Sequence, residues 1–226
     1  DANLANVAAA DINTIAGDTS GTVTVSNNIN LTGNSDVIAT AVGNVNTFSG
    51  TPTATLGDAH TLAELKAINN AIGGTITLND YSVALSGSAA DIKAALAGTF
   101  ASTYTGNVTI TDANLANVAA ADISTIAGAT NGTATVTNNI NITGTSAAIA
   151  TAVANIDTFS GTPTATLSDA HTLAQLKAIN NATSGQLTLN DYSVAISGSA
   201  ADIKAALAGT FAAAYTGNVV INDANG

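Results

Sequence analysis

The stretch DANLANVAAADINTIAG occupies residues 1–17, and DANLANVAAADISTIAG occupies residues 112–128. The second copy stays in register with the first, without insertion or deletion, so the chain divides into copies at 1–111 and 112–222. Residues 223–226 begin a third copy with the letters DAN. A long internal period is the signature of repeat architectures, whose units stack on their neighbours around a continuous core. We therefore expect one continuous repeat structure without a linker, cut at both ends from a longer array.

The composition is that of a folded, acidic chain. Apolar residues make up 46% of the 226 residues and aromatic residues only 4%, so we expect a thin core of small aliphatic side chains. The chain has four lysines, no arginine and fifteen acidic residues, which gives a net charge of −11. Charged residues are only 8% of the chain, the opposite of a disordered acidic tail.

The same composition argues against several classes of partner and site. Nucleic acids and anionic membrane surfaces are bound largely through Lys and Arg, which are scarce here. The chain has no cysteine, so disulfides and thiolate metal sites are unavailable. No apolar run approaches the roughly 20 residues that a helix needs to cross a bilayer, so we expect no membrane insertion.

Each copy divides again into two half-units of about 55 residues, because 111–132 aligns with 168–185. Alternation of β-branched and threonine residues is typical of half-buried strands. This pattern predicts eight principal strands, at 22–25, 51–56, 75–78, 108–111, 132–137, 162–167, 185–190 and 217–222. Shorter apolar runs predict additional strands at 29–33, 82–87, 140–144 and 193–198.

A helical segment is expected after each principal strand. Three apolar stripes have helical spacing: Leu4, Val7, Ile12 and Ile15; Leu62, Leu65 and Ile68; and Ile92, Leu96 and Phe100. Helix starts are indicated by pairs that resemble capping boxes, namely Thr61 with Glu64, Thr172 with Gln175 and Ser88 with Asp91.

Strand and helix predictions combine into one fold class. Each half-unit is expected to be β-α-β-β-α, and strand–helix–strand connections of this length favour parallel pairing with right-handed crossovers. The predicted fold is an open α/β solenoid, with a parallel sheet on one side, helices on another and extra short strands in alternate repeats.

A polar residue follows each principal strand. These corner residues are Asn27, Asp58, Asp80, Asp112, Asn138, Asp169, Asp191 and Asp223. One interpretation is Asx-turn and helix-cap chemistry, in which the side chain accepts hydrogen bonds from backbone amides. The other is calcium bridging between successive corners, since calcium prefers carboxylate oxygens. We favour capping because no calcium-loop motif is present, and the calcium candidates are Asp58, Asp80, Asp112, Asp169, Asp191 and Asp223.

Threonine pairs on the strands form a second regular feature. They are Thr22 and Thr24, Thr53 and Thr55, Thr75 and Thr77, Thr109 and Thr111, Thr133 and Thr135, and Thr164 and Thr166. T-x-T pairs that are aligned on successive strands of a flat sheet resemble the ice-binding face of solenoid antifreeze proteins. The alternative is that threonine is simply a good exposed strand residue. The second copy interrupts the array with Gln186 and Val220.

No constellation of catalytic residues is recognisable. His60 and His171 repeat at the same position, beside Asp58 and Asp169, but no nucleophile elbow accompanies them. Glu64 becomes Gln175 in the second copy, an exchange that a general acid would not survive. We expect no enzymatic activity, no catalytic residue and no cofactor.

The strand–Asx–helix units, such as LTLNDYSVAISGSAADIKAALAG (187–209), resemble tandem repeats of very large secreted surface proteins of marine cyanobacteria and proteobacteria. This resemblance covers the whole chain and rests on repeat style and composition. It implies an α/β-solenoid fold, a location outside the cell or on its surface, and a scaffold or adhesin-like role.

The expected function is therefore a structural segment of an extended extracellular protein: a spacer, filament or adhesin stalk. The alternative is a binding module, either for ice through the threonine face or stiffened by calcium through the Asx corners. The expected partners are neighbouring repeats of the same chain, and open stacks leave backbone groups unpaired at their ends. We therefore also expect end-to-end self-association into filaments.

Overall fold

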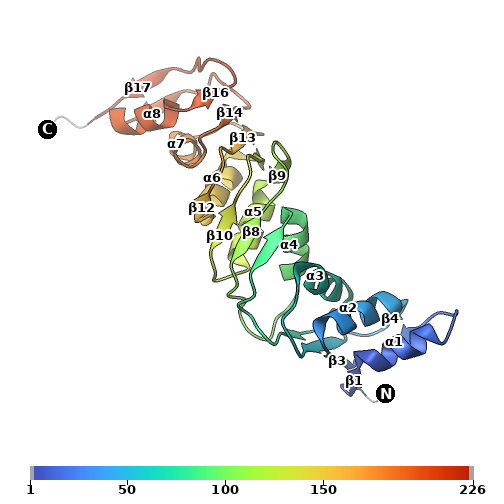
Figure 1. Ribbon diagram of the computed structural model, residues 1–226. Helices are drawn as coiled ribbons and strands as arrows, with labels where there is room; N and C mark the ends of the chain where they lie inside the picture. The colour runs from blue at the N-terminus through green and yellow to red at the C-terminus, as the bar shows by residue number, and fades with distance from the viewer. Residues whose placement is uncertain (1–2, 224–226) are drawn as a thin grey trace. The chain divides into compact units, whose positions relative to one another are not determined.

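A computed structural model describes residues 3–223, so the third-copy residues 224–226 lie outside the described range. Within residues 3–223 the chain is a mixed α/β protein with eight helices and seventeen short strands (Figure 1). It divides into two compact units: unit 1 comprises residues 1–108 and 129–132, and unit 2 comprises 109–128 and 133–226. The division falls close to the boundary between the two sequence copies.

Unit 1 contains four helices and seven strands before its boundary with unit 2. The helices are α1 (Ala9–Gly17), α2 (Ser35–Asn44), α3 (Leu62–Ala71) and α4 (Ala89–Leu96). The strands are β1 (Asn6–Ala8), β2 (Thr24–Val25), β3 (Asn30–Gly33), β4 (Thr47–Phe48), β5 (Thr53–Leu56), β6 (Ile76–Thr77) and β7 (Leu85–Gly87). Strand β8 (Val108–Ile110) lies where unit 1 ends and unit 2 begins.

Unit 2 repeats this order of elements and adds a short strand, β16, after its last helix. Its helices are α5 (Ala120–Gly128), α6 (Ser146–Asn155), α7 (Leu173–Ala182) and α8 (Ala200–Leu207). Its strands are β9 (Asn117–Ala119), β10 (Ala134–Val136), β11 (Asn141–Gly144), β12 (Thr158–Phe159), β13 (Thr164–Leu167), β14 (Gln186–Thr188), β15 (Ile196–Gly198), β16 (Thr210–Phe211) and β17 (Val219–Ile221).

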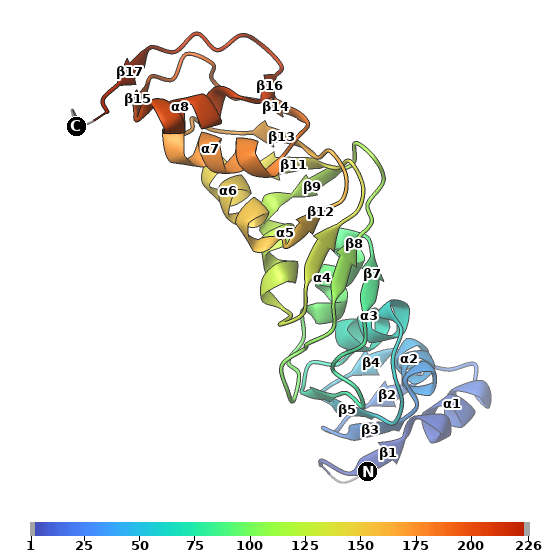
Figure 2. The ribbon, with the colours of Figure 1, turned by 60° about the vertical axis from the view of Figure 1, so that its left-hand side comes forward.

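Strand pairing within each unit is parallel, and paired residues lie a short distance apart in the sequence. Unit 1 holds a sheet with the order β1-β3-β5-β6 and a separate pair β2-β4, and Figure 2 shows β1, β3 and β5 side by side. Unit 2 holds the order β9-β11-β13-β14-β16 and the pairs β10-β12 and β15-β17. Residues paired in these sheets are 22 to 24 positions apart.

The helices of each unit pack in chain order. In unit 1, α1 contacts α2, α2 contacts α3 and α3 contacts α4; α5 to α8 do the same in unit 2. The core lies between helices and strands and is aliphatic, for example Leu31, Ile38, Leu65 and Ile68, which are fully buried. Burial of such side chains contributes about 1.5–3 kcal/mol each, so the core stabilises the fold despite its few aromatic residues.

The structure confirms parallel pairing and the predicted strands, most of which are shorter than expected. It also confirms two helices in each half-unit. A short strand follows every helix except α4, after which Phe100 forms only an isolated bridge, so the smaller repeat is β-α-β. The sequence pattern did not predict β1, β4, β9, β12 and β16, which have only two or three residues each. Such short strands lack the four or more alternating residues on which strand prediction depends.

One predicted helical stripe is wrong in part. Helix α1 begins only at Ala9, and Val7 belongs to β1. Leu4 has a φ of +62° and points its side chain outward, 71% exposed, while Ile15 is 57% exposed. Only Ile12 of this stripe is buried. In the third predicted stripe, α4 ends at Leu96, and Phe100 instead bridges to Ile76 of β6.

Candidate functional site

The threonine pairs lie on several different strands and do not form one array. Thr53, Thr55 and Thr77 lie in the sheet of unit 1, where Thr55 is directly opposite Thr77. Thr24 lies on β2, whose partner is β4, and Thr164 and Thr166 lie on β13 of unit 2. Of the remaining pairs, Thr109 lies on β8 and Thr135 on β10, whereas Thr22, Thr75, Thr111 and Thr133 lie just outside strands.

A shorter polar array exists within each unit, and it includes residues that the sequence analysis missed. In unit 1, Thr32 of β3 pairs with Thr55, which pairs with Thr77, so three threonines occupy one column. Thr143, Thr166 and Thr188 form the equivalent column in unit 2. The signal was present in the sequence, because N-L-T at 30–32 has the same alternation as T-x-T.

Asparagine side chains connect these strands beside the threonine column. Asn30 Nδ2 donates to Asn6 Oδ1 at 2.8 Å, and Asn30 Oδ1 accepts from the hydroxyls of Thr53 at 3.0 Å and Thr55 at 3.2 Å. Unit 2 repeats the ladder around Asn141. Much of the hydrogen-bonding capacity of this polar face is therefore used inside the protein, between neighbouring strands.

An exposed leucine stands beside the polar face of unit 2. Leu115, with a φ of +64° and 72% exposure, lines a shallow hollow together with Asn141, Thr164 and Thr166. Leu4 has the same conformation in unit 1. A positive φ disfavours residues other than glycine, because the β-carbon approaches the backbone. Both leucines are thus held outward by the backbone, in the same way in each copy.

Five of the eight Asx corners fall into two structural classes, helix caps and local turns. Asp58 Oδ1 accepts from the amide of Ser35 at 2.7 Å, at the start of α2, and Asp169 accepts from Ser146 at 2.6 Å, at the start of α6. Each therefore caps the helix of the preceding strand–helix turn, not the helix that follows it in sequence. Asp223 lies similarly against the amide of Ala200.

The second class closes local turns. Asp80 Oδ1 accepts from both the amide and the hydroxyl of Ser82, and Asp191 accepts in the same way from Ser193. These bonds lower the pKa of the Asp80 and Asp191 carboxyls. Asn138 instead donates to the carbonyls of Thr111 and Asp112. Across residues 3–223, no three His, Asp or Glu side chains are grouped so that they could hold a metal ion.

The two buried histidines each pair with a tyrosine, buried Tyr104 in unit 1 and half-buried Tyr215 in unit 2. His60 is 3% exposed, and its Nε2 lies 3.1 Å from Tyr104 Oη, which donates to the carbonyl of Val83 at 2.6 Å. Since the hydroxyl proton is used on Val83, His60 Nε2 must donate to the tyrosine oxygen. Its Nδ1 is then an unprotonated acceptor, which is buried and has no hydrogen-bond partner among the described residues.

Burial lowers the pKa of His60, against the opposing fields of Asp80, Glu64 and Asp58. His171 pairs with Tyr215 in the same way, at 3.0 Å, and burial lowers its pKa as well. The repeated histidines are evident in the sequence, but their tyrosine partners were not predicted from it. The repeated spacing of 44 residues is the signal that could have found them.

Both predicted Thr-based capping boxes are confirmed, at Thr61 with Glu64 and at Thr172 with Gln175. At the third site Ser88 accepts from the amide of Asp91, while the Asp91 carboxylate pairs with Lys66 of α3 at 2.5 Å. Lys177 and Asp202 form the same pair between α7 and α8. These ion pairs join neighbouring helices, and both partners are about 40% exposed, so they contribute little to stability.

Comparison with known proteins yields no matching family model, no matching curated protein and no matching solved structure. None of the helices within residues 3–223 has both the length and the apolar character that a membrane span requires. The side-chain hydrogen bonds described above cap helices, close turns or join adjacent strands.

Proposed function

We propose that this chain is a structural segment of an extended protein. It is built as a stacked α/β solenoid, and its role is that of a spacer. The observation that supports this most strongly is the separation of bonded residues. Strand partners are 22 to 24 positions apart in both units, so each strand–helix turn bonds to the next one along the chain. A fold of nearest-neighbour contacts extends by the addition of turns.

The helix caps support the same proposal. Asp58 belongs to the turn that contains α3, yet it caps α2 of the turn before, and Ser35 at the start of α2 donates to Glu64 of α3 at 3.0 Å. Asp169, Ser146 and Gln175 repeat the arrangement. A single turn would lack these partners, and stability would therefore rise with the number of turns.

We propose an extracellular or cell-surface location for this segment. The absence of cysteine, the absence of arginine and the net charge of −11 agree with the large secreted surface proteins that the repeats resemble. In such a protein the segment would serve as a spacer, filament or adhesin stalk. It would act through its length and its stiffness.

The test is a series of chains with two, four and six copies of the 111-residue repeat. Small-angle scattering should show a maximum dimension that grows by the same increment for each added pair of copies. The unfolding midpoint in urea should rise along the series and level off. If the radius of gyration instead grew with about the 0.38 power of chain length, as for compact domains, the proposal would be wrong.

A second candidate, ice binding, is favoured by the threonine column of Thr32, Thr55 and Thr77. It requires the column to present hydroxyls outward, although the hydroxyl of Thr55 is already bonded to Asn30. Thermal hysteresis of the purified chain tests this candidate. We would expect Thr77→Lys to abolish hysteresis, with Thr14→Lys, on the exposed side of α1, as the control. No hysteresis in the unmodified chain rules the candidate out.

A further inference from the structure

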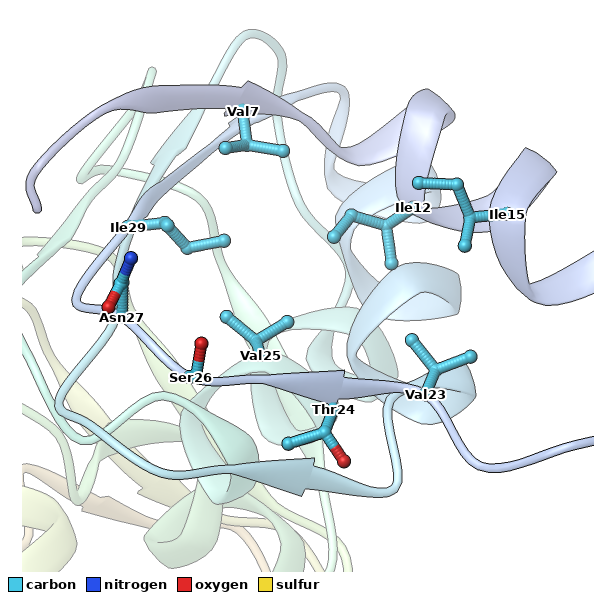
Figure 3. A pocket seen from close by; sticks show the side chains of 9 residues that line it. All are labelled: Val7, Ile12, Ile15, Val23, Thr24, Val25, Ser26, Asn27 and Ile29. Carbon is cyan, nitrogen blue, oxygen red and sulfur yellow. The ribbon is translucent and has the colours of Figure 1, made fainter. Parts of the chain in front are cut away.

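Two hollows of this protein differ in the kind of side chain that lines them. Figure 3 shows the first, a pocket of about 200 Å³ in unit 1, where the side chains of Val7 and Val25 point toward one another. The equivalents of these residues in the second copy, Val118 and Val136, are buried. Packing between successive turns therefore accounts for the apolar wall of this pocket.

The second is a shallow hollow of about 270 Å³ on the polar face of unit 2. It is lined by residues that all belong to unit 2, namely Leu115, Asn141, Thr164, Thr166, Gln186 and Thr188. They come from the segment before β9 and from β11, β13 and β14, which Figure 2 shows side by side. Neighbouring strands lie about 4.8 Å apart, so the hollow extends across roughly 14 Å of the sheet.

Strand alternation determines which side chains face this hollow. Ala165 of β13 and Leu187 of β14 are paired and fully buried, so their side chains point into the core. Thr166 and Thr188, the next residue on each strand, point to the opposite face and lie directly opposite one another. None of the six lining residues is charged, although the chain has a net charge of −11. The hollow is therefore suited to a neutral ligand.

The polar side chains of the hollow differ in how much hydrogen-bonding capacity they have left. The hydroxyls of Thr164 and Thr166 both donate to Asn141 Oδ1, at 3.1 and 3.2 Å, so their oxygens are left with acceptor lone pairs only. The side chains of Gln186 and Thr188 make no hydrogen bond to any residue within 3–223, and Gln186 is exposed. The hollow thus offers fixed acceptors beside groups that can both donate and accept.

Leu115 adds an apolar surface that packing does not explain. Its side chain is 72% exposed, its φ is +64°, and its amide donates to the carbonyl of Asn139 at 2.7 Å, which holds this conformation. An exposed position with a positive φ is ordinarily filled by glycine or asparagine. Backbone strain of this kind is concentrated at sites that bind ligands. The position of Leu115 beside unpaired polar groups therefore points to a ligand with both an apolar and a polar side.

Unit 1 provides an internal comparison. The positions equivalent to the lining residues are Leu4, Asn30, Thr53, Thr55, Thr75 and Thr77. They differ from unit 2 at one place only, because Thr75 stands where unit 2 has Gln186. A glutamine amide has two N–H donors and a carbonyl acceptor on a longer side chain, whereas a threonine hydroxyl has one donor. Gln186 is therefore the residue that distinguishes the hollow of unit 2.

We propose that the hollow of unit 2 binds a neutral polysaccharide, with one sugar ring packed against Leu115 and another hydrogen-bonded to Gln186 and Thr188. A pyranose ring has an apolar face of C–H groups and a rim of hydroxyls that both donate and accept, which matches this lining. Because the hollow is shallow and runs along the sheet, it admits several successive rings of a chain. The inference goes beyond the proposed spacer role and does not depend on it, since it uses only the local geometry of unit 2.

Affinity electrophoresis of the full chain tests the proposal. Native gels contain one of three neutral polysaccharides, dextran, galactomannan or hydroxyethyl cellulose, or the anionic polysaccharide alginate. At least one neutral polysaccharide should retard the chain relative to a gel without polysaccharide, and alginate should leave its mobility unchanged. Unchanged mobility in all three neutral gels overturns the inference. Retardation by alginate as strong as that by the neutral polysaccharides overturns it as well.

Two variants locate the site. Leu115→Gly removes the apolar surface, and the fold should survive because glycine adopts a positive φ without strain. Gln186→Thr introduces the residue that unit 1 itself carries at position 75, so it is also compatible with the fold. Each variant should weaken the retardation about tenfold, through loss of apolar contact in the first and of hydrogen bonds in the second. Melts followed by circular dichroism check that both variants are folded in the gels.

Leu4→Gly is the matched control, because Leu4 has the same conformation and exposure in unit 1. It should be retarded like the unmodified chain. Undiminished retardation of Gln186→Thr, or a loss in Leu4→Gly as large as that in Leu115→Gly, contradicts the assigned site. None of these outcomes affects the scattering series with two, four and six copies, so the inference and the proposed function can fail separately.

Discussion

His60 Nε2 and Tyr104 Oη lie 3.1 Å apart, although 44 residues separate them, and His171 and Tyr215 repeat this relationship at 3.0 Å. Both histidines are 3% exposed and have an Nδ1 without a partner among the described residues. A neutral imidazole, protonated on Nε2 alone, is tolerated there, whereas a buried imidazolium would lose its hydration. Each copy thus contains one buried histidine whose neutral form supports the fold.

The first prediction concerns acid stability. The folded-state pKa of each histidine is lowered by burial, so the unfolded chain, with a histidine pKa of about 6.5, takes up the proton first. The histidine contribution to stability is fully present above that value and is lost as the pH falls below it. Urea midpoints between pH 7.5 and 5 should therefore decrease. The double variant His60→Gln and His171→Gln should show a flatter profile over the same range, and an equally steep profile would contradict this explanation.

The second prediction concerns the caps between turns. Asp58→Ala removes the acceptor for the amide of Ser35, and loss of a helix cap costs about 0.5–2 kcal/mol. Asp169→Ala should cost a similar amount, because its bond to Ser146 is the same. The control is Asp18→Ala, since Ala129 occupies the equivalent position in the second copy. Urea denaturation measures all three, and a neutral Asp58→Ala would refute the capping role.

The third prediction concerns the asparagine ladder. Asn30→Ala removes a side chain that bonds to Asn6, Thr53 and Thr55, and it leaves polar groups unsatisfied on a half-buried face. We expect a loss of about 1–3 kcal/mol. Asn6→Ala, at the edge strand β1, removes only the bond to Asn30 and should cost less. Equal losses for the two variants would show that the ladder does not act as a connected network.

The fourth prediction concerns calcium. Asp58 and Asp169 cap helices, and Asp80 and Asp191 close turns. Because these carboxylates already have protein partners, the melting temperature in calcium should equal that in a chelator. Differential scanning calorimetry in both conditions is the measurement. A melting temperature that rises with calcium concentration would restore the Asx corners as a metal site.

The fifth prediction compares two glycines. A β-carbon at Gly106 would overlap the carbonyl oxygen of Val83, so Gly106→Ala should destabilise the protein by several kcal/mol. A β-carbon at Gly43 meets no atom within 4 Å, and Ala154 stands at the equivalent position in the second copy. Gly43→Ala should therefore be neutral or stabilising by about 0.4–1 kcal/mol. Thermal melts of the two variants distinguish a packing constraint from a general effect of glycine.

Much of the secondary structure was predictable because it depends on local patterns. The alternation around Ala54 and Leu56 predicted β5, and the capping box of Thr61 and Glu64 located the start of α3. The stripe that begins at Leu4 failed for a local reason as well. Apolar spacing does not reveal a positive φ, and the pairing of Val7 with Leu31 of β3 converts the predicted first turn into a strand.

The candidate sites were predictable only in residue type. The sequence showed that threonines, Asx corners and histidines repeat, but which of them meet depends on a pairing offset of 22 to 24 residues that local patterns do not contain. Because of that offset, the Asp58 carboxylate caps α2 instead of α3. The same offset places Thr24 and Thr55 in different sheets.

By itself, the sequence determined that this is a repeated α/β chain with parallel strands, because periodicity and helix starts are encoded in neighbouring residues. Only the tertiary structure decided how each copy is completed: which carboxylate caps which helix, which tyrosine meets which histidine, and which isoleucines are exposed. These contacts join residues more than 20 positions apart. Their partners are set by the closure of one turn upon the next, through burial and hydrogen bonding that exist only once the chain has folded.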